Sequence, residues 1–294
     1  MKYLLLTLLL ILTGCDEEPP AEIPSHLLVK NGGMTFEQGS KKPFTGVSVK
    51  YHENGEPEEK VTFEAGKETR KTVFIYDYNG QFKTKVNFID GKKHGLWENY
   101  WSNGQLKSKE NYKVGEKHGL WERYHENGLL DRKINYLDGK EDGLWESYRE
   151  NGKLYLKRNF IDGKADGLWE EYYENGQLLQ KGNYIDGKAN GVWESYWANG
   201  QLNRKGNYID EERDGLWEWF YDNGQLNGKG NYIAGDREGV WETYGRPMVK
   251  IRSYKDGMLH GLYQNFHPQD GYSALDYPKC YQNGKEVNLS ICKQ

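Results

Sequence analysis

The hydrophobic and polar positions of this chain recur with a period of 24 residues. Each unit opens on Gly-Leu-Trp-Glu or Gly-Val-Trp-Glu, runs through a Tyr to Asn-Gly, and returns through Leu and Lys to a final Tyr or Phe. The opening glycines are Gly95, Gly119, Gly143, Gly167, Gly191, Gly215 and Gly239. A looser copy opens at Gly261, and weaker copies lie at 43–55 and 71–80. A fixed period of this length indicates a repeat architecture and argues against a globular enzyme.

Within one unit the pattern predicts two strands joined by a tight turn. In 95–112, strand-forming residues flank Asn103-Gly104 on both sides. Asn-Gly favours a two-residue type I′ turn, because both central residues of that turn need a positive φ. Asp-Gly pairs, such as Asp162-Gly163, predict the return turn from one hairpin to the next.

A two-residue loop at Asn103-Gly104 sets the register of the predicted hairpin. It pairs Trp101 with Leu106 and Glu98 with Lys109. The same register pairs a Glu with a Lys in the later copies: Glu122 with Lys133, Glu146 with Lys157, Glu170 with Lys181, Glu194 with Lys205, and Glu218 with Lys229. Opposite charges across a strand pair contribute roughly 0.2–1 kcal/mol each. We therefore expect one face of the sheet to carry rows of ion pairs, beside a column of Tyr.

The opposite face is predicted to be aromatic. It carries Trp, the Leu after each turn and the strand-ending Tyr or Phe. The register also places Trp opposite Gly in three copies: Trp169 with Gly182, Trp193 with Gly206, and Trp217 with Gly230. A ring lying over a Gly protects the bare strand backbone. One hairpin alone is marginally stable, so we expect the copies to stack through a shared aromatic ladder at roughly 10 Å per repeat.

These patterns predict an all-β fold, an elongated single-layer antiparallel sheet of tandem 24-residue hairpins. Composition agrees, because aromatic residues make up 14% of the chain and aliphatic residues are sparse after the first dozen positions. The rings, rather than a thick aliphatic core, must therefore supply most of the buried area. The net charge of −4 gives the chain no electrostatic reason to bind nucleic acid.

The first residues have the pattern of a targeting segment. Lys2 precedes an apolar run over 3–12, which is too short to span a bilayer and is typical of a signal peptide. The segment Leu12-Thr13-Gly14-Cys15 resembles the lipobox of bacterial lipoproteins, which implies that Cys15 is lipidated. An ordinary signal peptide with a chance Cys is the alternative. We assign 1–14 to a lipoprotein signal peptide and 15–29 to the lipidated Cys and an acidic, Pro-rich tether.

A lipid anchor would place the chain in the bacterial cell envelope, facing the periplasm. Asp16 followed by Glu17 resembles an inner-membrane retention signal of enteric bacteria, so we expect the inner membrane. In this oxidising compartment Cys280 and Cys292 are expected to pair as a disulfide, with two free buried thiols as the alternative. The repeat pattern ends at about 266, and we assign 30–266 to the array and 267–294 to a C-terminal cap.

The repeat itself carries a resemblance to a known family. The pattern Y-x-D-G-K-x-x-G-x-W-E-x-Y-x-x-N-G-x-L-x-x-K is similar to the variant MORN repeats of bacterial proteins, which are often labelled antitoxin components. The similarity covers roughly residues 30 to 290. It implies a β-hairpin array used for binding, and it supplies no catalytic residues.

The residues show no catalytic or metal-binding pattern. His94 and His118 occupy equivalent turn positions, which lie about 10 Å apart in such a sheet and are too distant for one zinc ion. The turn at 162–167 lacks the alternating acids of a calcium loop. Nucleophile-elbow, zinc-protease and P-loop motifs are also missing from the sequence. We expect no enzyme activity, no metal and no cofactor.

A binding site is better sought where the copies differ. The position four residues after each Trp, just before the turn, lies on the Trp face and changes from copy to copy. These pre-turn residues are Trp101, His125, Arg149, Tyr173, Trp197 and Tyr221. Aromatic residues and Arg are enriched in binding hot spots, so we predict that they contact a partner and that replacing them changes stability little. A tolerant sheet edge is the alternative.

Together these features predict a non-catalytic, membrane-anchored binding protein of the periplasm. The expected partner is a protein, and the expected role is that of an immunity or antitoxin protein that occludes a toxin or effector, such as a secreted lipase. The alternative is an envelope scaffold that organises a membrane or cell-wall complex. The sequence carries no signal for an oligomeric state.

Overall fold

The computed structural model describes residues 22–77, 79–245, 248–266 and 278–293. The signal peptide, Cys15 and Asp16 lie outside the described residues, so lipidation and sorting stay predictions. The chain divides into two compact units. Unit 1 comprises Met1–Ile75 and Lys85–Lys92, and unit 2 comprises Tyr76–Thr84 and Lys93–Gln294.

Unit 1 is built on a short antiparallel meander. Its elements are β1 (Glu22–Pro24), the 3-10 turn η1 (Ser25–Leu27), β2 (Leu28–Asn31), β3 (Met34–Glu37), β4 (Gly46–Tyr51), β5 (Pro57–Glu64), β6 (Lys67–Tyr76) and most of β7 (Phe82–Ile89). Strands β4, β5 and β6 pair in order, β1 pairs parallel with β4, and β2 with β3 forms a separate sheet. Phe44, Val61 and Phe63 form its small core.

The tether prediction is wrong for 22–29. These residues form β1, η1 and the start of β2. Ile23 and Leu28 pack against the core of unit 1, and Glu22 forms an ion pair with Lys60 at 2.8 Å. The Pro and acidic residues pointed to an extended tether, but two apolar side chains are enough to dock this stretch on a neighbouring aromatic cluster.

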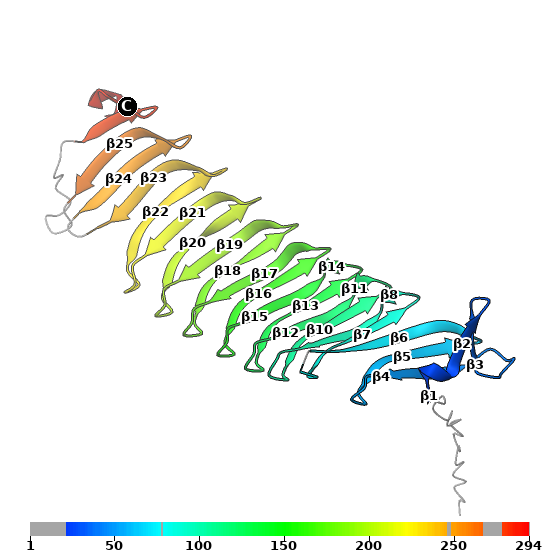
Figure 1. The fold of residues 1–294 in the computed structure, drawn as a ribbon. Coiled ribbons are helices and arrows are strands. Elements are labelled where there is room, and N and C mark those ends of the chain that lie inside the picture. The colour runs from blue at the N-terminus through cyan, green and yellow to red at the C-terminus, as the bar shows by residue number, and fades with distance from the viewer. Residues whose placement is uncertain (1–21, 78, 246–247, 267–277, 294) are drawn as a thin grey trace, which may run out of the picture. The chain divides into compact units, whose positions relative to one another are not determined.

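Unit 2 is a single-layer antiparallel meander. Its strands are β8 (Lys92–Lys93), β9 (Gly95–Tyr100), β10 (Leu106–Lys113), β11 (Glu116–Lys117), β12 (Gly119–Tyr124), β13 (Leu130–Leu137), β14 (Lys140–Glu141), β15 (Gly143–Tyr148), β16 (Leu154–Ile161), β17 (Lys164–Tyr172), β18 (Leu178–Ile185), β19 (Lys188–Tyr196), β20 (Leu202–Ile209), β21 (Glu212–Phe220), β22 (Leu226–Ile233), β23 (Asp236–Tyr244), β24 (Val249–Lys255), β25 (Met258–Phe266), β26 (Lys279–Gln282) and β27 (Lys285–Val287). Figure 1 shows β10 to β25 side by side in chain order. The predicted all-β repeat fold is confirmed.

The helices among the described residues are η1 and η3 (Leu289–Lys293), and none there is long and apolar enough to cross a membrane.

The Asn-Gly turns differ from the prediction. Trp101 N–H donates to Gln105 O at 2.8 Å, and Gly104 N–H donates to Trp101 O at 2.9 Å, which encloses a three-residue loop. Gly104 has a φ of 83°, whereas Asn103 does not have a positive φ. This is a type I turn with a glycine bulge, the second common way of closing a hairpin.

The longer loop shifts the register beside the turn. Tyr100, not Trp101, pairs with Leu106. A bulge between Leu106 and Ser108 then restores the predicted pairing of Glu98 with Lys109. The prediction is therefore wrong beside the turn and confirmed in the body of the hairpin.

The type I′ turns are instead the Asp-Gly return turns. Asp162 and Gly163 have φ values of 52° and 82°, so both central residues are left-handed. The Asn of Asn-Gly is used for its side chain. Asn103 Oδ1 accepts from Gln105 N–H at 2.9 Å, and its Nδ2 donates to Glu126 O of the next turn at 2.8 Å.

The Glu–Lys face joins consecutive repeats. Lys181 is opposite Glu170 in its own hairpin, as predicted, and it also faces Glu194 of the next hairpin, with which it forms an ion pair at 2.9 Å. Tyr196 O–H donates to the same Glu194 carboxylate at 2.7 Å. Hydrogen bonds from Tyr196 and Lys181 hold the pKa of the Glu194 carboxyl below its ordinary value. Equivalent ion pairs join Lys133 with Glu146, Lys205 with Glu218, and Lys229 with Glu242.

The described part of the cap continues the sheet. Strand β26 pairs antiparallel with β25, and β27 pairs with β26. Cys280, which is 1% exposed, forms a disulfide with Cys292 across a Cα–Cα distance of 5.8 Å. The predicted disulfide is confirmed, and the alternative of two free thiols is wrong.

Candidate binding surfaces

The aromatic ladder is confirmed in unit 2. Trp and the strand-ending Tyr alternate along one face, with ring centroids 5.4 Å apart for Tyr184–Trp193 and 5.1 Å apart for Tyr208–Trp217. Both pairs meet edge to face, the arrangement that the ring quadrupoles favour. Trp217 is 1% exposed although the sheet is a single layer. Around Trp217, Tyr232 and Trp241 the rings therefore supply the burial that a second layer provides in other β folds, whereas Trp169 and Trp193 are half-buried.

Each Gly under a Trp is covered by the next repeat. Trp169 is opposite Gly182 in the register, as predicted, but a Cβ on Gly182 would lie 2.1 Å from the ring of Trp193. The cause is a bulge in which Gly191, Val192 and Trp193 face the single residue Gly182. Trp193 Nε1 then donates to Asn183 O at 3.3 Å. Trp217 over Gly206 and Trp241 over Gly230 repeat the arrangement.

The six pre-turn residues share one contact. In each case the end of the side chain reaches the main-chain oxygen of the residue 23 positions ahead, in the next repeat. The pairs are Trp101 with Tyr124 (3.1 Å), His125 with Tyr148 (3.1 Å), Arg149 with Tyr172 (3.0 Å), Tyr173 with Tyr196 (2.8 Å), Trp197 with Phe220 (3.1 Å) and Tyr221 with Tyr244 (2.7 Å). All six are half-buried.

This contact gives the pre-turn residues a structural role that the sequence analysis missed. Their types vary, but each carries an N–H or O–H donor at the end of a long side chain. That shared property was visible in the sequence, whereas the acceptor, a backbone oxygen of the next repeat, was not. Their predicted contact with a partner stays a prediction.

The face opposite the ladder carries a second feature that sequence reasoning missed. From Leu120 to Val240, the aliphatic residue after the opening Gly and the one before the return turn are exposed, with Ile185 at 52% and Val192 at 63%. Strand alternation places them on the Glu–Lys face. We call this set the aliphatic stripe: Leu120, Leu137, Leu144, Ile161, Leu168, Ile185, Val192, Ile209, Leu216, Ile233 and Val240. At about 10 Å per repeat the stripe runs roughly 50 Å.

Both histidines lie at return turns, where His118 Nδ1 is 3.5 Å from Asp138 Oδ1. Val114 N–H donates to His94 Nδ1 at 3.4 Å. In a later copy Asp186 N–H donates to the equivalent Asp166 carboxylate at 3.1 Å. Within the ranges that the structure describes, no three or more His, Cys, Asp or Glu side chains are grouped as a metal site requires.

The repeat pattern matches the model of the MORN repeat variant family. The matched segments are 44–65, 93–113, 117–138, 141–162, 165–186, 189–210 and 213–234, more than half of the chain. The chain belongs to the MORN repeat variant family. This MORN-variant protein is a repeat-based binding scaffold, and each match after the first starts on the strand that follows a return turn.

Comparisons beyond the family are weak. No curated protein matches this MORN-variant chain. Among solved structures, it is similar to the crystal structure of TcdB2-TccC3, at 12% identity and a TM-score of 0.23 over 75% of this chain and 15% of that chain. A second, TcdB2-TccC3-TEV, matches at 10% identity and a TM-score of 0.20 over 85% of this chain and 16% of that chain. TM-scores this low carry no argument about function.

Proposed function

We propose that this MORN-variant protein is a non-catalytic binding protein of the bacterial cell envelope, anchored through Cys15, whose aliphatic stripe receives a protein partner. The observation that carries the proposal is the stripe itself. Two exposed aliphatic side chains recur in each repeat from Leu120 to Val240. Large continuous apolar patches are rare on monomeric proteins and mark interaction surfaces.

The length and chemistry of the stripe favour a protein over a small molecule. A run of roughly 50 Å is the dimension of a folded domain and exceeds any single small ligand. The ion pairs beside the stripe, such as Lys181–Glu194, already match positive with negative charge. Covering them with a partner therefore leaves no charge without its counterpart, which limits the desolvation cost.

The finer proposal is an immunity protein that occludes a toxin or effector, such as a secreted lipase. It is supported by the resemblance of residues 12–15 to a lipobox and by the antitoxin label of similar repeats. A scaffold that organises an envelope complex is the alternative. Capture of one stoichiometric toxin supports the immunity role, and capture of several envelope proteins supports the scaffold.

The decisive experiment is capture of partners by the soluble chain that begins at Asp16. A triple variant, Leu168→Ser with Ile185→Ser and Val192→Ser, removes three exposed side chains of the stripe. Exposed substitutions usually change stability by no more than about 0.5 kcal/mol each, so the variant should fold and lose the partner. Serine substitutions at Lys153, Gln177 and Gln201, which are exposed beside the Asn-Gly turns, provide the matched control.

Two results would contradict the proposal. If the triple variant captures the same partner as the control, the stripe is not the surface. If neither chain captures a specific protein, the binding role is wrong. The anchor is tested separately by Cys15→Ser, which should move the protein from the membrane to the soluble fraction.

A further inference from the structure

The aromatic ladder carries the chain's own cations at most of its Trp residues. Lys117 lies 4.5 Å from the ring centroid of Trp121, and Arg213 lies 4.6 Å from that of Trp217. Each of these cations is four residues before its Trp, and each also lies over the following Tyr. Lys93 on Trp97 and Arg237 on Trp241 repeat the arrangement. A cation over an aromatic face is attracted by the ring quadrupole.

The middle of the ladder uses a cation from a different position. Arg158 lies between two rings, 4.2 Å from the centroid of Trp145 and 4.5 Å from that of Trp169. The position four residues before the Trp is Glu141 in the repeat of Trp145 and Ala165 in the repeat of Trp169, so neither supplies a cation, and Arg158 stacks on both rings instead.

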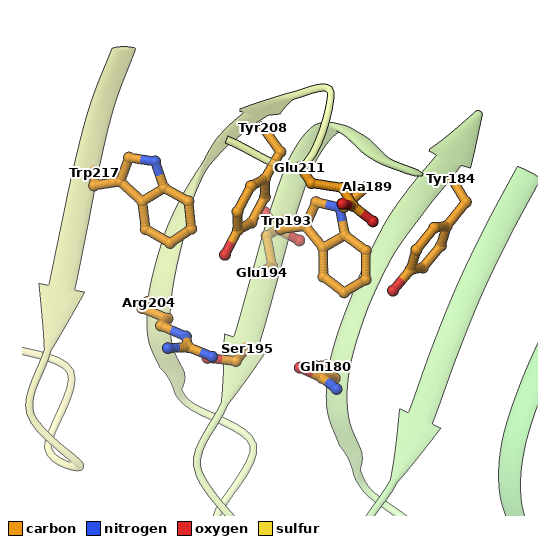
Figure 2. A pocket seen from close by; sticks show the side chains of 10 residues that line it. All are labelled: Gln180, Tyr184, Ala189, Trp193, Glu194, Ser195, Arg204, Tyr208, Glu211 and Trp217. Atoms are coloured by element: carbon orange, nitrogen blue, oxygen red, sulfur yellow. The ribbon is translucent and has the colours of Figure 1, made fainter. Parts of the chain in front are cut away.

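Trp193 is the exception. The residue four positions before it is Ala189, and among the described residues no Lys or Arg side chain stacks on Trp193. A pocket of about 250 Å³ opens at this place. Its walls include Ala189 and the rings of Tyr184, Trp193, Tyr208 and Trp217, which follow one another along the pocket in Figure 2.

A carboxylate replaces a glycine at the same pocket. Glu211 lines it and has a φ of 75°, at the turn position that Gly187 and Gly163 occupy in the preceding repeats. A side chain at such a φ costs free energy, and strain of this kind is often retained at functional sites. Burial, and after it the negative charge of Glu211, raises the pKa of Tyr184, which places that charge close to the aromatic walls.

Donors line the other end of the pocket. Arg204 and Ser195 lie there in Figure 2, away from Ala189, together with Gln180, whose Nε2 already donates to Glu171 at 2.7 Å. The Arg204 guanidinium would repel a cation beside it, but it can donate to a carbonyl or carboxylate oxygen. The pocket therefore presents an aromatic and acidic end and a hydrogen-bond-donating end.

We propose that this pocket, which lies on the ladder face, binds an arginine or lysine side chain from a segment of the protein partner that reaches around the sheet from the stripe. The cation takes the place over Trp193 and Tyr208 that Arg213 takes over Trp217 and Tyr232, and Glu211 neutralises it. Carbonyl oxygens of the same partner segment accept from Arg204 and Ser195. A volume of about 250 Å³ suits one side chain better than a large ligand, since small-molecule pockets begin near 300 Å³. This inference rests on the proposed function for its source of the cation, but the pocket can be tested alone.

The first test uses small probes and no partner. N-acetyl-arginine amide, N-acetyl-lysine amide and the neutral N-acetyl-citrulline amide are titrated into the soluble chain, and binding is followed by saturation-transfer NMR. We expect at least one of the two cations to bind at least tenfold more tightly than citrulline. Equal binding of all three would overturn the proposal. Tighter binding of choline than of either amide would assign the pocket to a small organic cation and overturn the side-chain source.

The second test fills the pocket with the chain's own cation. Ala189→Arg copies Arg213 and Arg237, so it should fold and reduce probe affinity at least tenfold. Gln177→Arg adds the same charge at an exposed turn where the preceding repeat has Lys153, and it should leave probe binding unchanged. Glu211→Gln should weaken cation binding severalfold and leave citrulline unaffected, which keeps the test open if Ala189→Arg does not fold.

The outcomes separate this proposal from the proposed function. Wild-type probe affinity in both Ala189→Arg and Glu211→Gln would overturn the pocket, whatever the partner experiment shows. Cation-selective probe binding without any partner capture would uphold the pocket and contradict the protein-binding role. Loss of partner capture in Ala189→Arg, but not in Gln177→Arg, would uphold both.

Discussion

At the scale of single residues, hydrogen-bonding ability explains positions that residue type alone does not. Trp101, His125 and Tyr173 look unrelated, yet each places a polar side-chain end against the next repeat. The sequence could reveal that these side chains are long and carry donors. It could not reveal the acceptor, because that oxygen belongs to a backbone whose register depends on bulges.

This shared contact predicts the effect of removing one hydroxyl. Tyr173→Phe keeps the ring but removes the donor to Tyr196 O, so it should cost about 1 kcal/mol of unfolding free energy. Urea unfolding measures the loss. Tyr51→Phe, at a tyrosine that is 52% exposed, is the control and should be close to neutral. Equal unfolding midpoints for the two variants would show that the contact carries no stability.

Replacing the strained turn residue Glu211 is expected to raise the unfolding free energy, the opposite of the effect of Tyr173→Phe. Its φ of 75° is one that glycine adopts without cost, so Glu211→Gly should stabilise the protein by about 1 kcal/mol. Thermal unfolding should show a higher melting temperature. A lower melting temperature would mean that the carboxylate contributes more in the folded chain than its backbone conformation costs.

At the scale of elements, the strands and the Glu–Lys pairing could be predicted because a 24-residue period and cross-strand charges define both. The turn chemistry could not, since Asn-Gly also suits a three-residue loop when the Asn side chain bonds the backbone. The ring over Gly182 was assigned to the wrong repeat for a similar reason. In the bulge, three residues of one strand lie opposite the single residue Gly182, and this places the ring of Trp193 over that glycine. The alternation of side chains along a strand does not predict such bulges.

The contact between Trp and Gly predicts a large effect from one methyl group. A Cβ on Gly206 would lie 2.1 Å from the ring of Trp217, so Gly206→Ala should displace the ring and destabilise unit 2 by about 2 kcal/mol or more. Denaturant unfolding gives the value. In a Trp217→Ala background the same substitution should cost far less, and an unchanged cost would show that the ring is not the obstacle.

The Glu–Lys rows predict a dependence of stability on pH. The folded-state pKa of Glu194 is lower than its ordinary value of 4.5, so the unfolded chain binds more protons below neutrality. The stabilisation is therefore complete above about pH 4.5 and is lost as pH falls through the folded-state pKa. Glu194→Gln should flatten the acid limb of a plot of unfolding free energy against pH. An identical limb in the variant would contradict the assignment.

At the scale of the whole molecule, the sequence identified a repeat array and the structure located its two chemically different faces. The aliphatic stripe was within reach of the sequence, because its residues stand next to the Trp and the strand-ending Tyr or Phe, but the pattern does not show whether these residues are exposed. The pocket at Trp193 needed the structure. The structure places Lys117, Arg158 and Arg213 on the rings of other ladder Trp residues. Against that pattern, the small side chain of Ala189 explains why the ring of Trp193 has room for a ligand.

The aliphatic stripe is proposed as the surface that a protein partner covers. Site-specific photo-crosslinking in the producing cell tests it most directly, with the photoreactive amino acid placed in turn at Ile185, at Val192 and at Gln177. We expect crosslinks to the same protein from Ile185 and Val192 and none from Gln177, which lies at an exposed turn. Crosslinks from Gln177 alone, or none from either stripe position, would contradict it.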